Sequence, residues 1–314
     1  MKRLIVFLSC LQLLADVYNE NCPRIEGAYR IMTFNLRRMG KEDASARLWP
    51  ARVNNIRSLL EDTEPDFFGV QEAYRKQIDS LLDSPFIKNN YSWIGRGRKE
   101  GVKDQKVKIG KIKVNIPLSD VINVEGEHSS IFYRKDKFKK LDHGTFWLNK
   151  DKKENKQGWG EPYNRICSWI KLQDKNTKQI FWMFNTHLAV KSKEAREKGL
   201  ALILAEMMKK VKDNEIAFLT GDFNDLSLDP ESSLGKVIRN PAYPVVDTAE
   251  LAEKKYGPTY TALTKEWTAG HKKIDFITVH DPSKIQVLTQ CILSPKKGKI
   301  ISDHLPVMID FKVN

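Results

Sequence analysis

The sequence predicts an α/β fold in which β-sheets pack face to face and helices lie outside them. Short apolar runs, mostly rich in aromatic or β-branched residues, follow one another along much of the chain. Few amphipathic helical segments separate them, whereas a repeated βαβ fold would alternate more regularly. The chain also has no internal repeat. Packed sheets with outer helices are therefore the expected architecture.

The composition of the 314 residues, with 41% hydrophobic and 30% charged residues, is that of a globular protein. It excludes disordered, fibrous and polytopic membrane classes. The length fits one large domain or two small ones. Lys and Arg number 53 against 40 Asp and Glu, giving a net charge of +13. Such an excess favours phosphates, nucleic acid or anionic membrane surfaces as partners.

The first elements after the N-terminal segment can be assigned in order. Residues 28–36 are rich in β-formers and predict a strand, whereas residues 50–62 carry apolar side chains at helical spacing. Pro50 stands where a first helical turn tolerates proline. Residues 66–72 predict a buried strand, and residues 73–82 predict a second helix.

The rest of the chain predicts a dense succession of strands interrupted by one strong helix. That helix, residues 193–212, places Leu200, Ile203, Leu204 and Met207 on one face, which is typical of an ordinary core-facing helix. The expected strands are residues 91–97, 129–135, 144–148, 166–173, 179–188, 216–222, 273–279, 286–293 and 304–313.

One segment differs in charge. Residues 96–113 hold eight basic residues against two acidic ones, and residues 106–116 alternate charged and aliphatic side chains around Gly110. This pattern predicts a basic β-hairpin. The lysines either bind a polyanion or keep an exposed sheet edge soluble. We expect an insertion at about 96–126 that decorates one domain rather than forming a second.

The N-terminus has the layout of a short secretory signal. Two basic residues precede an apolar stretch that is too short to span a bilayer, and Ala15 follows it. A first strand or a buried N-terminal segment is the alternative. We expect a signal peptide at 1–15, a linker at 16–27 and a single domain at 28–314. The protein would then be exported, periplasmic or secreted, and cytoplasmic if the leader is not cleaved.

The cysteines indicate neither a zinc site nor a disulfide scaffold, because no C-x-x-C pair and no close histidine partner is present. Isolated thiols are the expected state. Cleavage after Ala15 would leave three cysteines, so at most one disulfide could form within the chain. The four positions are Cys10, Cys22, Cys167 and Cys291.

Polar residues of catalytic type recur at the carboxyl ends of the apolar runs or beside them. A strand that ends in a polar group delivers that group to the rim of its sheet. Several such groups on one rim would make a site for a metal ion and a phosphate. These residues are Asn35, Glu72, His187, Asp222, Asn224, Asp275, Asp303 and His304.

In order and local context, the segments TFNLR, VQEA, NTHLA, GDFND, KKIDFI and SDHLPV resemble the signature motifs of the endonuclease/exonuclease/phosphatase superfamily. This superfamily includes deoxyribonuclease I, apurinic endonucleases, deadenylases, neutral sphingomyelinases and inositol-polyphosphate 5-phosphatases. The resemblance covers residues 28–313, and residues 47–56, 129–138, 144–148 and 165–169 also resemble an exported bacterial branch. It implies a deoxyribonuclease I-like four-layer α/β sandwich, with two mixed β-sheets flanked by helices.

The resemblance also implies a metal site. Hydrolysis of a phosphate ester needs an activated water, neutralised phosphate oxygens and a stabilised leaving oxygen. Glu72, a hard carboxylate, is the expected Mg²⁺ ligand, with Asn35 beside it as a ligand or an orienting group. Asp303 is a second candidate ligand. One metal or two remain open, and Mn²⁺ is a possible substitute.

The resemblance implies catalytic roles for the remaining motif residues. Asp222 would orient and deprotonate the attacking water, and Asn224, two residues on in an extended segment, would hold a phosphate oxygen. His304 would contact the phosphate while Asp275 holds its ring in the right tautomer. His187 would lie against the scissile phosphate. Taken singly, each of these residues could instead be an ordinary turn or surface residue.

Three further residues are candidates for substrate binding. Arg37 would be a second side chain that holds the phosphate, in addition to His304. Arg165, and His128 in the Glu127-His128 pair, could line the cleft. For these last two, a solvent-facing arginine and a loop pair are equally good interpretations.

These features predict a Mg²⁺-dependent phosphoesterase in which water attacks phosphorus directly. The charge of +13 and residues 96–113 favour a nuclease slightly. A phosphatase or phosphodiesterase acting on a sugar, inositol or lipid phosphoester, including a sphingomyelinase-like enzyme, is the alternative, and a catalytically silent binding module is a more remote one. We expect a phosphate-containing substrate, possibly nucleic acid, no stable protein partner and a monomer.

Overall fold

The structure is a computed structural model of the chain. The predicted signal peptide lies outside the residues that it describes. These are residues 18, 22–40, 45–100, 104–109, 112–117, 125–225, 228, 231–267 and 269–314.

The first sheet has seven strands: β1 (Tyr29–Asn35), β2 (Phe67–Gln71), β3 (Tyr91–Ile94), β6 (Ile131–Arg134), β12 (Lys254–Tyr256), β16 (Ile285–Ile292) and β17 (Val307–Val313). Their order is β12-β16-β17-β1-β2-β6-β3. Strand β1 pairs parallel with β2 and antiparallel with β17, so the sheet is mixed.

The second sheet has six strands: β7 (Phe138–Trp147), β8 (Ile166–Asp174), β9 (Ile180–His187), β10 (Ile216–Asp222), β11 (Val245–Asp247) and β15 (Asp275–His280). Their order is β11-β15-β10-β9-β8-β7, with β9 and β10 parallel and β15 antiparallel to β10.

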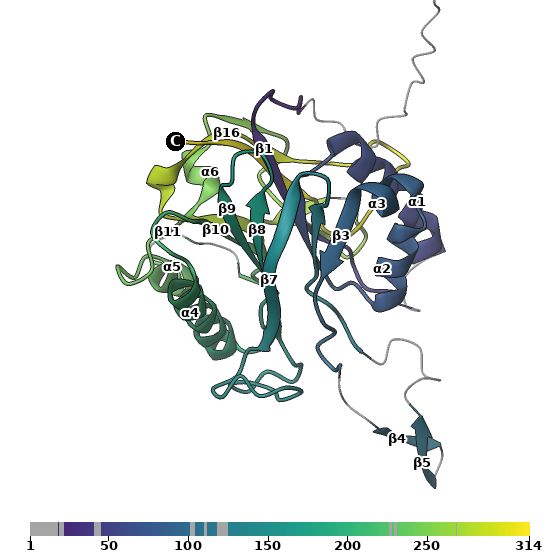
Figure 1. The fold of residues 1–314 in the computed structure, drawn as a ribbon. Coiled ribbons are helices and arrows are strands. Elements are labelled where there is room, and N and C mark those ends of the chain that lie inside the picture. The colour runs from purple at the N-terminus through teal and green to yellow at the C-terminus, as the bar shows by residue number, and fades with distance from the viewer. Residues whose placement is uncertain are drawn as a thin grey trace, which may run out of the picture.

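The helices cover the two outer faces (Figure 1). On the first sheet lie α1 (Trp49–Thr63), α2 (Arg75–Leu82) and α3 (Pro85–Asn90); on the second lie α4 (Lys193–Lys210) and α5 (Ser233–Ile238). The shorter elements are α6 (Thr248–Leu251), the 3₁₀ turns Ser45–Arg47 and Pro282–Lys284, and the strands β13 (Ala262–Leu263) and β14 (Gly270–Lys272). None of the described helices is both long and apolar enough to span a membrane.

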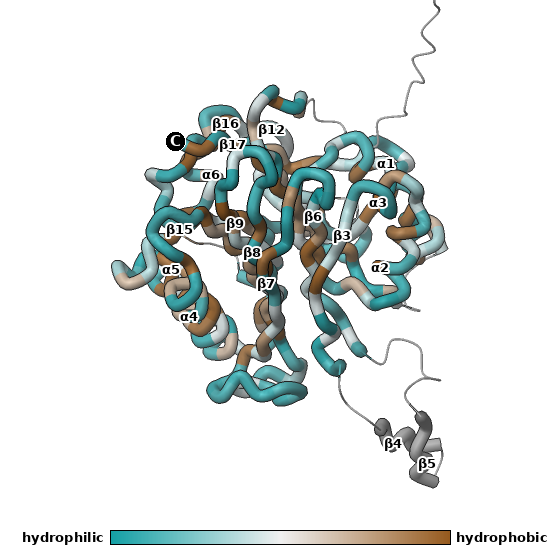
Figure 2. The backbone as a smooth tube through the Cα atoms, in the orientation of Figure 1, coloured by the Kyte–Doolittle hydropathy of each residue, from teal (hydrophilic) through white to brown (hydrophobic). Residues whose placement is uncertain are grey.

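Three apolar clusters hold these layers together. The central cluster lies between the sheets and includes Phe67, Phe181, Phe218 and Phe311, all fully buried. One further cluster packs α1–α3 on the first sheet, and another packs α4 and α5 on the second. Figure 2 shows hydrophobic segments along the strands and hydrophilic segments in the outer loops. This arrangement confirms the predicted four-layer α/β sandwich.

The strong helices begin and end where their sequences lead one to expect. The Ser192 hydroxyl accepts a hydrogen bond from Ala195 N at 3.1 Å and caps α4, while Lys209 and Lys210 lie in its last turn, where cations are favourable. Helix α1 ends at Thr63 and is followed by the C-cap residue Glu64, which has a left-handed φ of 44°.

Other boundaries differ from the prediction. Strand β7 begins at Phe138 rather than at 144, because its first half is mostly exposed and polar and shows no apolar signal. The sequence also did not predict α3, nor the short elements α5, α6 and β11–β14 between residues 233 and 272. They have only two to six residues each, too few to show a periodicity.

The predicted basic hairpin is confirmed in its backbone. Strands β4 (Asp104–Ile109) and β5 (Ile112–Pro117) pair antiparallel, with Ile109 opposite Ile112 and Asp104 opposite Pro117.

The expectation of isolated thiols is wrong for two of the cysteines. Cys22 and Cys291 form a disulfide across a sequence separation of 269, whereas Cys167 is free and buried in β8. The described part of the expected linker is consequently attached to the domain. Arg24 also pairs with Asp66 at 3.0 Å.

Candidate active site

Three predicted residues lie in one row across the second sheet. Asp222 ends β10, and its register partners are His187 at the end of β9 and Asp275 at the start of β15. The pairing of three strands thus brings together residues that are far apart in sequence. Asp222 and Asp275 are each 1% exposed.

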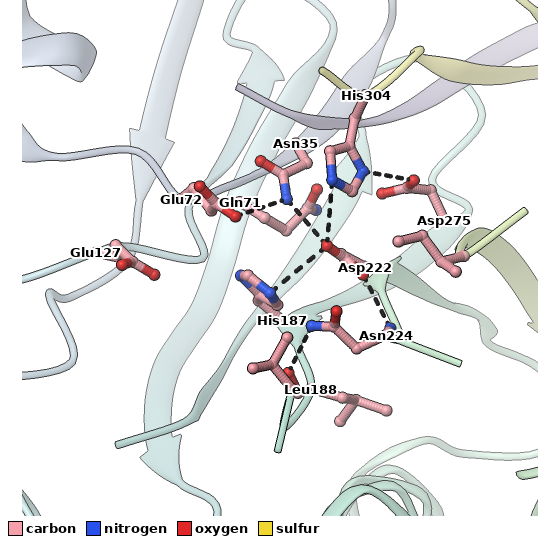
Figure 3. A network of polar contacts seen from close by, with 12 residues as sticks. Asn35, Gln71, Glu72, Glu127, His187, Leu188, Asp222, Asn224, Asp275 and His304 are labelled. Carbon is pink, nitrogen blue, oxygen red and sulfur yellow. Dashed lines mark hydrogen bonds and ion pairs between the residues drawn. The ribbon is translucent and has the colours of Figure 1, made fainter. Parts of the chain in front are cut away.

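The first sheet contributes Asn35 and Glu72, which lie opposite Asp222. Asn35 ends β1 opposite Gln71, and Glu72 follows with a left-handed φ of 59°. Asn35 Nδ2 donates to Asp222 Oδ2 at 3.0 Å and to Glu72 Oε1 at 3.3 Å, which joins the rims of the two sheets (Figure 3). Its Oδ1 accepts from Arg37 N at 2.9 Å, which fixes the amide orientation. This geometry fits an orienting group better than a metal ligand.

A buried polar bridge lies beneath this rim. Gln71 Nε2 donates to Asn185 Oδ1 at 2.6 Å, and Asn185 Nδ2 donates to Val70 O at 2.9 Å and Ser130 O at 3.0 Å. A Cβ atom on Gly69 would lie 2.4 Å from Asn185 Oδ1, so the glycine makes room for the bridge. The sequence analysis missed this bridge, because its polar members lie inside otherwise apolar strands.

His304 and Asp275 form a close pair. His304 Nδ1 lies 2.8 Å from Asp275 Oδ2, and His304 Nε2 lies 3.8 Å from Asp222 Oδ2. Because a carboxylate only accepts, His304 Nδ1 carries a proton. Burial alone would lower the pKa of His304, but the charges of Asp275 and Asp222 raise it well above its ordinary value. His304 is therefore suited to act as a cation.

Asp222 lies between two imidazoles in a buried environment. His187 Nε2 is 3.5 Å from Asp222 Oδ2. Burial, reinforced by the negative charge of Asp275, raises the pKa of Asp222 to about 7. Burial and the positive charges of Arg165 and Arg98 lower the pKa of His187 well below its ordinary value. A carboxylate with this pKa can accept a proton near neutral pH, as a general base must.

Asn224 reaches the site differently from the prediction. Its φ is 52°, and its N–H donates to Asp222 Oδ1 at 2.9 Å, so residues 222–224 form an Asx turn rather than an extended segment. The side-chain amide is held by Leu188 O, at 3.1 Å from Nδ2. Asn224 still lines the same cavity as Asp222.

The site offers groups that could hold a divalent metal ion. One ligand atom each from Glu72, His187 and Asp222 lies within 4.8 Å of the others, and the same is true of Asp222, Asp275 and His304. Carboxylate oxygens suit Mg²⁺ and Mn²⁺, whereas imidazole suits softer metals. Burial alone would raise the pKa of Glu72, but the Arg38 N–H and the charge of His304 keep it below its ordinary value.

Asp303, the second candidate ligand, lies in the same cavity, with Oδ2 3.7 Å from Arg37 Nε. Burial raises its pKa. Arg37, which was expected to hold the phosphate, lines the same cavity.

These side chains line a cavity of about 470 Å³. Four arginines contribute to its walls, which makes it suited to an anion. A second hollow, of about 810 Å³, is lined by Tyr29, Asp174 and their neighbours and holds none of the predicted site residues. The active-site cavity is lined by Arg37, Arg38, Glu72, Tyr74, Arg98, Glu127, Tyr163, Arg165, His187, Val190, Asp222, Asn224, Asp303 and His304.

The two remaining predicted residues, Arg165 and His128, differ in whether they line the cavity. Arg165 lines the cavity with its side chain 8% exposed, so it is not a solvent-facing arginine. His128 does not line it: Nδ1 lies 3.2 Å from Ala73 O and Nε2 lies 3.3 Å from Glu125 Oε2. The prediction of a substrate contact by His128 is therefore not supported, because both ring nitrogens already have partners.

Arg52 supports the site from behind and was not predicted. It is fully buried in α1 and donates to Leu36 O at 2.8 Å, to Arg37 O at 3.1 Å and to Ile301 O at 2.5 Å. It thereby ties the loop after β1 to the segment before Asp303. Its position on the helix gave no signal of this role, because the partners are backbone carbonyls far along the chain.

Comparisons with known proteins agree with this fold. The model of the Endonuclease/Exonuclease/phosphatase family matches residues 32–304. A crystal structure of an endonuclease/exonuclease/phosphatase from Bacteroides vulgatus is 28% identical over 91% of this chain and 99% of its own, with a TM-score of 0.77.

A mannosyl-6-phosphatase from Bacteroides thetaiotaomicron is 26% identical over 90% of this chain and 99% of its own, with a TM-score of 0.74. Protein L388 of Acanthamoeba polyphaga mimivirus is 23% identical over 84% of this chain and 92% of its own length.

Proposed function

The chain belongs to the endonuclease/exonuclease/phosphatase family, and from this membership we propose that it is a Mg²⁺-dependent phosphatase acting on a small phosphomonoester. Members of the family are generally phosphoester hydrolases. The observation that carries the proposal is the buried cluster of Asp222, His304 and Asp275, of which Asp222 and His304 line an arginine-lined cavity together with Glu72.

Hydrolysis in this site would begin with a water molecule held by Asp222. The carboxylate removes a proton from the water as the water oxygen bonds to phosphorus, and the ester P–O bond opposite the attack breaks. The departing oxygen takes the electron pair and a proton from solvent water, and Asp222 later releases its proton to solvent. His304, kept cationic by Asp275, stabilises the negative charge on the phosphate oxygens. Asn35 holds Asp222 in place through its 3.0 Å hydrogen bond.

The acidic groups fit a hard divalent cation. Glu72 is the first ligand by position. Three other carboxylates line the cavity, Glu127, Asp222 and Asp303, and of these Asp222 has an oxygen within 4.8 Å of a Glu72 oxygen. A bound Mg²⁺ would supply charge neutralisation to the phosphate and the leaving oxygen.

The cavity favours a small substrate over the polymer expected from the charge. Its volume of about 470 Å³ lies in the range of sites for small molecules. Among the described side chains of the basic insertion, Arg98 lines it. The similarity to a mannosyl-6-phosphatase supports the same choice. We therefore place a phosphatase above the nuclease.

The test is a hydrolysis panel with Mg²⁺ and with EDTA, over sugar phosphates, inositol phosphates, nucleoside monophosphates, DNA, RNA and sphingomyelin. We expect release of inorganic phosphate from a small monoester, with loss of activity in EDTA. Asp222→Asn should keep the fold and lower turnover by about 10²–10⁴-fold, because it removes the base but not the shape. Turnover at the wild-type rate in this variant would contradict the mechanism.

A nuclease is the second candidate, because the net charge is +13 and the hairpin at 106–116 is rich in lysine. Cleavage of a nucleic acid in the panel, with binding that weakens steeply as salt rises, would favour it. Replacing the four hairpin lysines Lys106, Lys108, Lys111 and Lys113 by Gln should then flatten that salt dependence by about 0.7–0.9 log–log units for each phosphate that the variant no longer neutralises.

We also propose that the protein is exported. The disulfide between Cys22 and Cys291 supports export, because such bonds persist in oxidising compartments and are rare in the cytosol. Expression of the full chain with and without residues 1–15 tests this. We expect the full chain to be processed and to be found outside the cytoplasm with two of its thiols blocked. Retention of an unprocessed, fully reduced chain in the cytoplasm would contradict it.

A further inference from the structure

One wall of the cavity is formed by residues that the hydrolysis step does not use. We name it the Glu127 wall; it consists of Arg98, Glu127, Tyr163 and Arg165. In Figure 3, Glu127 lies to the left of Glu72 and His187, on the side away from Asp222. A substrate whose phosphate lies against Asp222 has the rest of its structure free to extend toward this wall.

The wall contains a largely buried ion pair. Arg98 Nη2 donates to Glu127 Oε1 at 2.8 Å, with the side chains only 13% and 12% exposed. The backbone of Arg98 is held as well, because its carbonyl accepts from Trp147 Nε1 at 2.9 Å and from Asn164 Nδ2 at 3.1 Å. A carboxylate has about four acceptor positions, so Glu127 can accept further hydrogen bonds from a ligand.

Donors lie beside this acceptor. The Nε atoms of Arg98 and Arg165 are buried and have no hydrogen-bond partner among the described residues. The side chain of Arg165 is 8% exposed, and Nη2 lies 3.7 Å from Glu161 Oε1, beyond hydrogen-bond distance. Acceptor-only and donor-only groups side by side match hydroxyl groups, since each hydroxyl both donates and accepts.

An apolar platform completes the wall. Among the described residues, the exposed large hydrophobic side chains are Leu141, Tyr163 and Val190, at 41%, 46% and 41%, and the last two line this cavity. The Tyr163 ring is held beneath two guanidinium groups, 5.2 Å from Arg98 Cζ and 5.9 Å from Arg165 Cζ. A fixed aromatic face beside hydrogen-bonding groups is typical of sites that bind amphipathic rings.

We propose that the Glu127 wall is a specificity subsite for a hydroxyl-bearing sugar ring. The ring would stack on Tyr163 and share its hydroxyl groups between Glu127 and the two arginines. The substrate class would then be the phosphomonoester of a sugar. This inference rests on the proposed phosphatase function, which it makes more specific.

The experiment compares two substrates that share the phosphate and differ in the remainder. We would measure kcat/KM with Mg²⁺ for a hexose 6-phosphate and for phenyl phosphate, which has a ring but no hydroxyl groups. The wild type should favour the hexose ester by about tenfold or more. Glu127→Gln should lower this ratio by about tenfold or more, because hydrogen bonds to a charged group are lost.

Tyr163 provides the second pair of variants, and it is exposed enough for both to fold. Tyr163→Ala should raise KM for the hexose ester, whereas Tyr163→Phe, which keeps the ring, should preserve the ratio. Leu141→Ala is the matched control, because Leu141 is similarly exposed but lies outside the cavity. It should leave both substrates unaffected.

The outcomes separate the two proposals. If the wild type hydrolyses no phosphoester, the proposed function fails. If it hydrolyses phenyl phosphate but does not favour the hexose ester, or if the ratio is unchanged in both Glu127→Gln and Tyr163→Ala, the subsite is wrong and the phosphatase stands. A preference for a nucleoside monophosphate over the hexose ester would also overturn the sugar assignment, since a base would then occupy the wall.

Discussion

Replacing Asp275 by Asn tests the pair that we hold responsible for the charge on His304. Asp275 is 1% exposed, and its Oδ2 accepts from His304 Nδ1 at 2.8 Å. A hydrogen bond to a charged group contributes about 1.5–3 kcal/mol. At about 1.4 kcal/mol for each factor of ten, its loss in the transition state should lower kcat by about 10- to 150-fold.

The same variant should shift the pH–rate profile in a defined direction. Burial and the charge of Asp275 together raise the pKa of Asp222 to about 7, and the charge of Asp275 also raises the pKa of His304 against the effect of burial. In the proposed mechanism Asp222 acts deprotonated, so activity should fall as pH decreases through its pKa. His304 acts protonated, so activity should fall as pH increases through its pKa. Without the charge at 275 both pKa values decrease. Both limbs of the profile should therefore move to lower pH.

The assay is initial-rate phosphate release from pH 5 to 10 at saturating Mg²⁺. Asp247→Asn is the matched control, because Asp247 is a buried carboxylate on the neighbouring strand β11 that pairs with Lys273 at 2.7 Å outside the cavity. Its profile should match the wild type. A folded Asp275→Asn enzyme with kcat within twofold of wild type and an unshifted profile would refute the role of the pair.

Three further predictions concern the metal, the disulfide and the bridge. Glu72→Gln should raise the Mg²⁺ concentration for half-maximal activity, and excess Mg²⁺ should restore part of the rate; an unchanged requirement would remove Glu72 from the metal site. Cys22→Ser should lower the free energy of unfolding by up to about 5 kcal/mol, given the separation of 269 residues from Cys291, and reductant should then have no further effect in denaturant titrations. Gly69→Ala should destabilise by about 1–3 kcal/mol in the same titrations, because its Cβ would displace Asn185 from buried hydrogen bonds; wild-type stability would contradict the proposed fit.

Much of the site could be predicted because catalytic-type residues end strands. His187, Asp222 and Asp275 come together through strand pairing alone, once their strands are neighbours in register. Only the family resemblance indicated that these strands are neighbours, because residue types do not specify which strands pair. Asn224 shows the limit, because an extended segment and an Asx turn place it at the same cavity by different routes.

The parts that escaped prediction depend on tertiary contacts with no local signal. Asn185 lies within an apolar strand, and nothing beside it indicates that its partners belong to the other sheet. Arg98 and Tyr163 lie in separate loops and meet only because both approach one cavity wall. The Cys22–Cys291 bond likewise requires that a segment before β1 reaches the end of β16. The partners of His128 also gave no local signal, since they are the Ala73 carbonyl and Glu125.

The position of the Asp222 carboxylate in the proposed active site depends on how the two sheets pack against each other. Its carboxylate belongs to the second sheet, yet its 3.0 Å hydrogen bond comes from Asn35 of the first. A second hydrogen bond, from Gln71 Nε2 to Asn185 Oδ1 at 2.6 Å, joins the same two sheets beneath the site. A change in sheet spacing would therefore displace the base from the residues of the first sheet, including Glu72. If the proposed mechanism holds, Gly69 and the buried amides of Gln71 and Asn185 contribute to the geometry of the reaction as well as to the stability of the fold.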